Sequence, residues 1–337
     1  MVKIKDIAKK CGVSIASVSK ALSGNSDLNA ETEERIKKIA KEMGYVPNAN
    51  ARSLKTNKSN NIGILFVDKT NSGLQHEYFS LILNSLKEEA EKNGFDVTFI
   101  SNSLKGGMSF YQHAKYRNCD GVIIASVDFK NPEVIELVES DIPTVTIDYI
   151  FNNASAVVSD NVKGLAEIVR YAYNKGHRKI AFIHGEDTNV TRQRIASFYK
   201  TMEEYEIQVP DEYVKKATYH LPRESGHATR ELLALKDRPT CIIYPDDYSL
   251  LGGLTEIESN GLRVPDDISV VGYDGINISR LLRPMITTYV QNSEGIGLLA
   301  AQKLVEIINH PKTSIPETIQ VSGFMQEGET VADINEW

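Results

Sequence analysis

The sequence predicts an α/β protein with a small N-terminal helical unit and a two-lobed body of doubly wound parallel sheets. Three observations lead to this fold class: short amphipathic helical segments before residue 45, apolar strands alternating with helices after residue 60, and a second start of that alternation near residue 160. With 337 residues, of which 41% are apolar and 25% charged, the chain is long enough for several cores.

The N-terminal segment has the pattern of two helices joined by a tight turn. Apolar residues recur at helical spacing in the first helix, at Ile4, Ile7, Ala8 and Cys11. Gly12 then supplies a turn that tolerates positive φ, and Ser14 is a good N-cap for a second helix over residues 15 to about 22. The small side chain of Ala8 lets the two helices approach closely, so the segment predicts a helix-turn-helix.

A third helix and an outward-facing surface complete this unit. The third helix is predicted to begin after an Asn29 cap and to stop at Gly44. Four residues of the second helix face outward, where they could reach base edges in a major groove: Ile15, Ala16, Ser17 and Lys20. Residues 1–60 carry 12 Lys and Arg against 6 Asp and Glu, although the whole chain has a net charge of −7. A basic unit on an acidic body is typical of polyanion binding.

From residue 61 onward, the strand segments NIGILFV, FDVTFIS and CDGVIIAS alternate with helices such as YFSLILNSLKEEAEKNG. This alternation predicts a parallel sheet covered on both faces. It begins again at Ser159, which predicts a second, similar lobe. Because open α/β sheets bind ligands at the carboxyl ends of their strands, polar residues at those ends are candidates for a ligand site.

Carboxylates end several of these strands, and an arginine stands early in a helix. Asp148 ends VTID, Asp246 ends CIIYPD, and Asp274 ends VVGYD, whereas Arg194 lies in TRQRIASFYK. Carboxylates and a guanidinium suit a polyhydroxylated ligand, because each can engage two adjacent hydroxyls. Three aromatic side chains could supply the apolar face of such a site: Tyr78, Phe79 and Tyr219.

Five stretches of the chain match one family pattern. They are DIAKKCGVSIASVSKALSG, ETEERIKKIAKEMGYVPNANARSL, CDGVIIAS, SDNVKGLAEIVRYAYNKGHRKIAFIHG and VPDDISVVGYDGINISRLLRPMITT. In these residues the chain resembles the lactose-repressor/galactose-repressor family of bacterial transcription regulators. The resemblance implies a headpiece over residues 1–58 with a hinge helix at 48–56, and a periplasmic-binding-protein-like body. The implied lobes are residues 59–160 with 291–319, and residues 161–290 with 320–337.

The resemblance also implies a transcriptional repressor that binds a palindromic double-stranded DNA operator. The segment from 48 to 54 allows only two helical turns, too few to be stable alone, so it should become ordered with DNA and a partner hinge. In the family a hinge leucine wedges between base pairs of the minor groove, and the matching residue here is Leu54. DNA contacts are therefore expected from Ser14, Ile15, Ala16, Ser17, Lys20, Asn48, Ala51, Arg52 and Leu54.

For the effector, the resemblance places Arg194 and Asp274 on paired ligand contacts, and Asp148 and Asp246 on positions that line the cleft between the lobes. A sugar or sugar derivative is expected, with a nucleobase or nucleoside corepressor as the alternative. Induction and corepression both occur in the family, so the sign of the response stays open. Where many relatives have ANDxxAxG, this chain has YPDDYSLLGG, so an acceptor-only aspartate replaces an amide at residue 246. Ser197, where the family has glycine, and the segment KTNSGLQHEYF should reshape the pocket mouth.

Two other classes of protein share parts of this pattern. GIGLLA, residues 295–300, matches the GxGxxA of a dinucleotide-binding enzyme, but no strand with an acidic ribose ligand follows about 20 residues on. A periplasmic sugar-binding protein would share the lobes, but MVKIKDIAKK has no apolar signal segment. We therefore expect no catalytic, metal or cofactor site, and a cytoplasmic protein without a membrane span.

A homodimer is expected, because two recognition helices are needed to read two half-sites. The body should supply the contact, through the helix after Tyr78 and through ISRLLRP after Asn277. Beyond His310 the chain has prolines at 311 and 316 and no 3.5-residue apolar repeat, so no coiled coil that would make a tetramer is expected.

Overall fold

The computed structural model describes residues 2–23, 28–46, 58–67, 73–103 and 107–335. They form two compact units, Met1–Ser59 and Asn60–Trp337, which are described separately here as the headpiece and the body.

The headpiece is a three-helix unit with its own core. Its helices are α1 (Ile4–Cys11), α2 (Ile15–Ser23) and α3 (Ala30–Glu42). Gly12 ends α1 with a φ of +67°, and the N–H of the next residue returns to the carbonyl of Ala8. The Ser14 hydroxyl accepts the Ser17 N–H at 3.0 Å and so caps α2. Seven buried side chains fill the space between the helices: Ile7, Ala8, Cys11, Val18, Ala21, Ile36 and Ala40. The predicted helix-turn-helix is confirmed.

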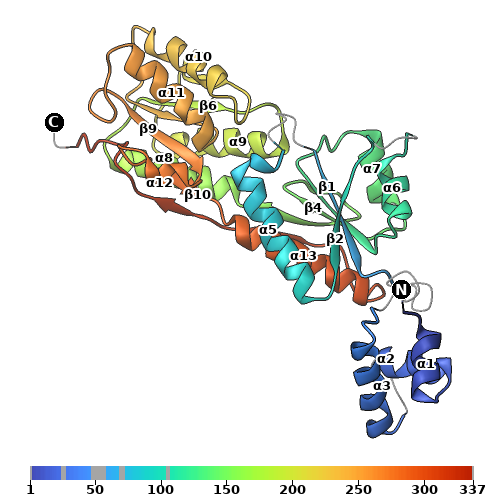
Figure 1. Ribbon diagram of the computed structural model, residues 1–337. Coiled ribbons are helices and arrows are strands. Elements are labelled where there is room, and N and C mark those ends of the chain that lie inside the picture. Colours follow the sequence, from blue (N-terminus) through green and yellow to red (C-terminus); the bar gives the residue numbers. More distant parts are fainter. Residues whose placement is uncertain (1, 24–27, 47–57, 68–72, 104–106, 336–337) are drawn as a thin grey trace. The chain divides into compact units, whose positions relative to one another are not determined.

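The body contains two six-stranded sheets, each covered by helices (Figure 1). The elements of the first part are β1 (Asn61–Phe66), η1 (Gly73–Gln75), α5 (Glu77–Lys92), β2 (Asp96–Ile100), α6 (Phe110–Tyr116), β3 (Gly121–Ala125), α7 (Pro132–Glu139), β4 (Thr144–Ile147) and β5 (Ser155–Ser159). The second part adds α8 (Asn161–Asn174), β6 (Ile180–His184), α9 (Asn189–Glu204), η2 (Asp211–Tyr213), β7 (Val214–Lys216), α10 (Pro222–Leu233), β8 (Cys241–Ile243), α11 (Asp247–Ser259), β9 (Ser269–Asp274), α12 (Ile278–Leu281) and β10 (Thr288–Val290). The last elements are α13 (Ser293–Asn309), β11 (Thr318–Val321) and β12 (Phe324–Gln326).

The strand orders are β11-β5-β4-β3-β1-β2 in the first sheet and β12-β10-β9-β8-β6-β7 in the second. All neighbouring strands run parallel except β12, which pairs antiparallel with β10. The doubly wound parallel sheets are therefore confirmed, with one antiparallel edge strand added. The chain passes from one sheet to the other after β5, after β10 and between β11 and β12, so three segments join the two lobes.

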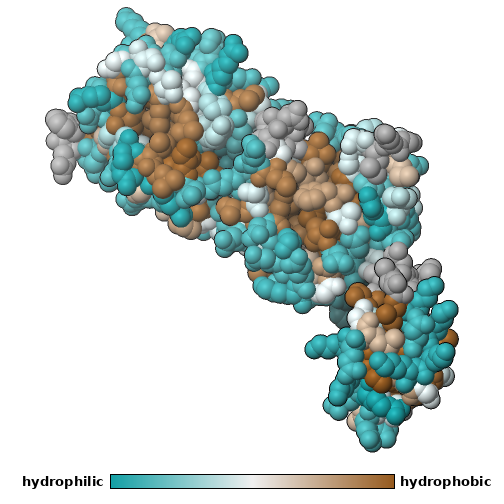
Figure 2. All heavy atoms as spheres, viewed as in Figure 1, coloured by the Kyte–Doolittle hydropathy of each residue, from teal (hydrophilic) through white to brown (hydrophobic). Residues whose placement is uncertain are grey.

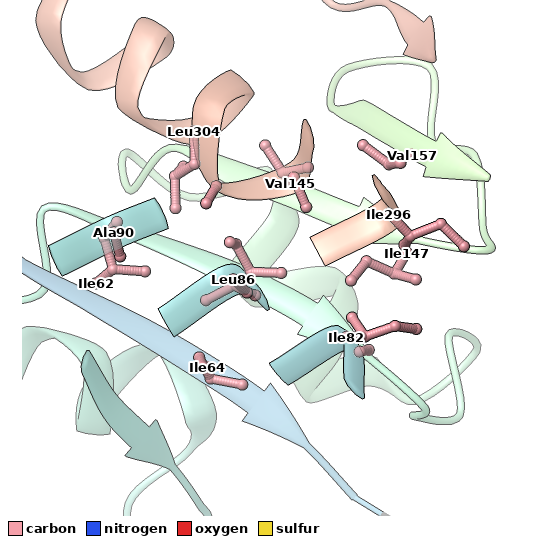
Figure 3. Packing of buried hydrophobic residues seen from close by; sticks show 14 of the residues in the cluster. Ile62, Ile64, Ile82, Leu86, Ala90, Val145, Ile147, Val157, Ile296 and Leu304 are labelled. Carbon is pink, nitrogen blue, oxygen red and sulfur yellow. The ribbon is translucent and has the colours of Figure 1, made fainter. Parts of the chain in front are cut away.

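Successive strand residues point to opposite faces of a sheet. Helices cover both faces of each sheet, so both sets of side chains are buried. In the first lobe, Ile123 faces the layer of α5 and α13, whereas Ile124 faces α6 and α7. Figure 3 shows Ile82 and Leu86 of α5 and Leu304 of α13 pointing toward side chains of β1, β4 and β5. The second lobe repeats this arrangement, with α8 and α9 on one face and α10 and α11 on the other.

The glycine-rich stretch GIGLLA lies in the first turns of α13 and serves helix packing. A Cβ on Gly297 would lie 2.1 Å from the carbonyl oxygen of Ile82, so only glycine lets α13 come this close to α5. Packing against α5 therefore accounts for this glycine of the GxGxxA match.

Among the described residues, no helix is both long and apolar enough to cross a membrane. Cys11 and Cys241 are buried, and Cys119 is partly buried.

Candidate functional site

In the headpiece, the outward surface of α2 combines apolar, hydroxyl and basic side chains. Ile15 is 55% exposed although it is a large apolar residue, and Ala16 and Lys20 beside it are also exposed. The hydroxyls of Ser14 and Ser17 lie 2.8 Å apart and hydrogen-bond to each other, and Ser14 also caps the helix. These side chains are therefore accessible from outside the headpiece core.

Four of the nine predicted DNA contacts cannot be placed on this surface. Asn48, Ala51, Arg52 and Leu54 lie outside the described residues. The remaining five lie together, at the turn before α2 and along its exposed side.

In the body, a cavity of about 190 Å³ lies between the two lobes. Six of the seven predicted effector residues line it: Tyr78, Phe79, Asp148, Arg194, Tyr219 and Asp274. They come from the start of α5, from the carboxyl ends of β4 and β9, from α9, and from the segment after β7. Strand ends and helix starts of both lobes thus converge on one space, as open α/β sheets favour.

The Arg194 guanidinium is almost fully buried and fixed from several sides. Its Nε donates to the side-chain oxygen of Asn161 at 2.8 Å, and its Nη1 donates to the carbonyl of Pro245 at 3.0 Å. Its Cζ lies 3.5 Å from the ring centroid of Tyr273, a cation–π distance. The side chain is held before any ligand arrives, and the guanidinium borders the cavity as a preorganised donor.

The two cavity aspartates belong to one hydrogen-bonded chain that crosses between the lobes. Asp148 accepts the Ser159 N–H at 2.9 Å and the Tyr78 hydroxyl at 3.2 Å. The Ser159 hydroxyl donates to the side-chain oxygen of Gln291 at 2.5 Å, and the Gln291 amide donates to Asp274 at 2.6 Å. Ser159 ends β5 and Gln291 follows β10, so this chain runs through two of the segments that join the lobes.

Burial affects the protonation of both carboxyls. Burial raises the pKa of Asp148, against the opposing effect of its hydrogen bonds and of Arg194. Burial also raises the pKa of Asp274, and the nearby Asp246 carboxylate raises it further. Polar ligand groups that donate hydrogen bonds to the charged carboxylates would offset this cost of burial.

Aromatic rings form the apolar part of the wall. The Tyr219 ring packs directly on Gly185, where a Cβ would lie 2.1 Å from the ring, and its hydroxyl lies 2.9 Å from the hydroxyl of Thr191. On the opposite lobe, Phe79 packs at 5.3 Å from Phe66, measured between ring centroids. Rings from both lobes therefore border the same cavity.

Two residues that the sequence analysis connected with the pocket are not among those that line the cavity. Asp246 does not line it: the Asp246 carboxylate accepts the Ser249 N–H at 2.7 Å and the His220 N–H at 3.0 Å, so it caps α11 and supports the wall from behind. Ser197 does not line it either, because its hydroxyl donates to the Val162 carbonyl at 2.6 Å and joins α9 to α8.

Sequence reasoning missed several lining residues, among them His76, Glu186, His220 and Gln291. Glu186 follows β6, so the strand-end rule could have found it. Gln291 lies where the chain changes lobes, and no local pattern marks it. His76 and His220 meet only in the folded body, from segments 144 residues apart, so no sequence spacing could have paired them.

The chain is similar to known regulators along its whole length. A family model described as "Bacterial regulatory proteins, lacI family" matches residues 3–48, and a "Periplasmic binding protein-like domain" matches residues 169–331. The probable HTH-type transcriptional repressor ExuR of Bacillus subtilis (strain 168) is 32% identical over 330 residues, covering 96% of this chain and 97% of that protein. The HTH-type transcriptional repressor PurR of Mannheimia succiniciproducens is 30% identical over 329 residues, covering 95% of this chain and 96% of that protein.

Solved structures share the fold. A lac repressor dimer bound to operator and the anti-inducer ONPF matches with a TM-score of 0.82 at 23% identity, covering 98% of this chain and 99% of that one. A complex of the transcriptional regulator CelR with cellobiose matches with a TM-score of 0.73 at 22% identity, covering 98% of this chain and all of that one. With a helix-turn-helix headpiece, two parallel-sheet lobes and near-full-length similarity to repressors, the chain belongs to the lacI family of bacterial regulatory proteins.

Proposed function

We propose that this protein is a sequence-specific DNA-binding repressor whose operator affinity is controlled by a small polyhydroxylated ligand, a sugar or sugar derivative, bound between the lobes of the body. The observation that carries the proposal is the cavity between the lobes, where a buried guanidinium and two buried carboxylates converge with aromatic rings. The protein binds this ligand without converting it chemically, and it acts in the cytoplasm.

The donor and acceptor set favours a ligand with several hydroxyl groups. Arg194 donates only, whereas ionised Asp148 and Asp274 accept only, so a ligand that serves all three must both accept and donate. A hydroxyl group does both, and adjacent hydroxyls match the two oxygens of a carboxylate. Tyr219 and Phe79 offer rings for the apolar face of a sugar. The similar CelR structure holds cellobiose, which supports this ligand class.

The ligand acts by linkage. It changes operator affinity only if it binds more tightly to one arrangement of the lobes than to another. The hydrogen-bonded chain from Asp148 through Ser159 and Gln291 to Asp274 supports such a difference, because a ligand held by both aspartates engages both lobes and two connecting segments.

The repressor acts as a homodimer that reads a palindromic operator. Three large apolar side chains are exposed on α5, α12 and β12: Leu81 at 38%, Leu281 at 71% and Phe324 at 57%. Leu81 and Phe324 line one groove, and Figure 2 shows apolar surface over both lobes of the body. Exposed apolar residues that lie together are typical of a subunit contact. Two headpieces then supply the two recognition helices that two half-sites require.

The DNA-binding half of the proposal is tested by selecting tight binders from a random duplex library with the full-length protein. We expect an inverted repeat to emerge. Leu54→Ala should weaken binding to that repeat more than binding to unrelated duplex, because phosphate contacts remain while the minor-groove wedge is lost. Equal losses on both duplexes would contradict the wedge, and recovery of no common sequence would contradict sequence-specific binding.

The ligand half is tested by a melting-temperature screen of sugars, glycosides, nucleobases and nucleosides, followed by calorimetry. We expect a sugar or sugar derivative to raise the melting temperature and to lose affinity in Asp274→Asn, which keeps the side-chain shape but loses the charge. Tight binding of a nucleobase, with no response to sugars, would overturn the ligand class. Unchanged ligand affinity in Asp274→Asn would contradict the placement of the ligand in this cavity.

A further inference from the structure

The lobes meet at a pair of histidines in the wall of the cavity. His76 comes from the first lobe and His220 from the second, and their ring centroids lie 3.7 Å apart with an interplanar angle of 64°. Both rings border the cavity. The two rings are in direct edge-to-face contact, and this contact joins the two lobes in addition to the chain crossovers.

Each ring is held in place by its own lobe. His76 precedes α5 and caps it, since its Nδ1 accepts the Phe79 N–H at 3.5 Å, and its ring packs at 4.7 Å from the Phe79 ring. His220 has a φ of +57°, a left-handed conformation, and its N–H donates to Asp246 at 3.0 Å. The His220 Nδ1 also lies 3.4 Å from the other carboxylate oxygen of Asp246, which is buried.

The residue after His76 makes a second contact with the other lobe. The Glu77 carboxylate accepts the N–H of Asn277 at 2.6 Å. The first turn of α5 therefore contacts the second lobe at two points, while the next two residues, Tyr78 and Phe79, border the cavity. Residues 76–79 therefore contribute both to the contact between the lobes and to the wall of the ligand site.

We propose that His76 and His220 form a latch that holds the lobes closed over the ligand site, and that Asp246 is a positioning residue that presents the His220 ring. The latch rests on the proposed function in one respect, that the ligand is bound between these lobes. It gives Asp246 a second role beside the capping of α11. It also makes the first turn of α5 the part of the first lobe that senses closure.

The test measures lobe closure directly and needs neither ligand nor operator. Spin labels are attached in full-length protein through keto amino acids introduced at Glu136 of α7 and Arg223 of α10, both exposed and in different lobes. Pulsed electron–electron resonance then gives the distribution of inter-lobe distances. His76→Asn and His220→Asn are the main variants, because asparagine caps helices well and tolerates the left-handed conformation.

We expect each variant to add a population at longer distance and to raise the open-to-closed ratio about 2- to 10-fold, as removal of one aromatic pair predicts. The double variant should open no further than either single variant, because both changes break the same contact. Asp246→Asn, which keeps an acceptor for the Ser249 N–H but removes the charge beside His220, should shift the distribution in the same direction by less. His227→Ala, an exposed histidine of α10, is the matched control and should leave the distances unchanged.

Unchanged distances in both single variants, or additive opening in the double variant, would overturn the latch. Opening in His220→Asn with none in Asp246→Asn would overturn the positioning role of Asp246. Because these readouts involve no effector or DNA, failure of the latch is distinguishable from failure of the proposed function, which the operator selection and the ligand screen test separately.

Discussion

Replacing Arg194 by alanine is expected to affect both the ligand site and the stability of the body. The side chain donates to two buried acceptors, the side-chain oxygen of Asn161 and the carbonyl of Pro245. An acceptor left unsatisfied in the interior costs about 1–3 kcal/mol. Loss of the contact with the Tyr273 ring adds to the destabilisation. Removal of the buried charge also removes its desolvation penalty, and this gain opposes the other losses.

Taking these opposing effects together, Arg194→Ala should lower the free energy of unfolding by about 2–4 kcal/mol. For a unit of this size that corresponds to a fall of roughly 3–7 °C in the melting temperature. Scanning calorimetry of the full-length protein measures it. Arg192→Ala is the matched control, because Arg192 lies on the same helix but pairs with Asp187 at the surface, where both side chains are more than 60% exposed.

The control should melt at the wild-type temperature, since exposed ion pairs contribute little. Equal melting temperatures for Arg194→Ala and the wild type would refute the view that Arg194 is fixed by buried partners. Ligand affinity measured on the folded fraction separates the two roles: Arg194→Ala should lose ligand binding even below its melting temperature, whereas Arg192→Ala should retain it.

Three further predictions concern protonation, packing and assembly. Because burial raises the pKa of Asp148 and Asp274, and a hydroxyl ligand needs their charged forms, calorimetric ligand affinity should fall on acidification beginning at a pH above the ordinary aspartate value of about 4; affinity that rises as pH falls would contradict this sign. Gly297→Ala should destabilise the body by about 1–3 kcal/mol in urea unfolding, because its Cβ would meet the Ile82 carbonyl, and an unaffected unfolding midpoint would show that α5 and α13 can separate freely. Light scattering should give twice the 37.5 kDa chain mass, and Leu281→Lys should shift the protein toward monomer; a wild-type monomer that still binds an inverted repeat tightly would refute the dimer.

Most of the fold follows from patterns of short range. The three headpiece helices are marked by apolar spacing and by the Ser14 and Asn29 caps, which the structure shows accepting backbone N–H groups. The two lobes follow from βαβ alternation, and the strand-end rule marked Asp148 and Asp274 as candidates, one in each sheet. They border one cavity because the two lobes face each other there. The antiparallel β12 was not predicted, since three residues after a turn carry too little periodicity to fix a direction.

What the sequence could not supply is which strand-end residue faces the cavity and which faces inward. Asp246 and Asp274 both follow buried strands, yet Asp246 caps the next helix and bonds to the segment around His220, whereas Asp274 borders the cavity. Capping is a local interaction that competes for the same carboxylate. The histidine pair and the Gln291 link depend on how two lobes meet, which is set by packing over the whole body.

If a ligand between the lobes changes the affinity of the protein for DNA, a single titration should show it. The operator found by selection is titrated with full-length protein at fixed salt, with and without a saturating concentration of the ligand found by the screen, for the wild type and for Asp274→Asn. We predict that the ligand changes the wild-type operator Kd by about 5- to 150-fold, while Asp274→Asn binds operator as the wild type does and no longer responds at that ligand concentration. An operator Kd that is the same with and without saturating ligand in the wild type, or an equal response in Asp274→Asn, would contradict the account.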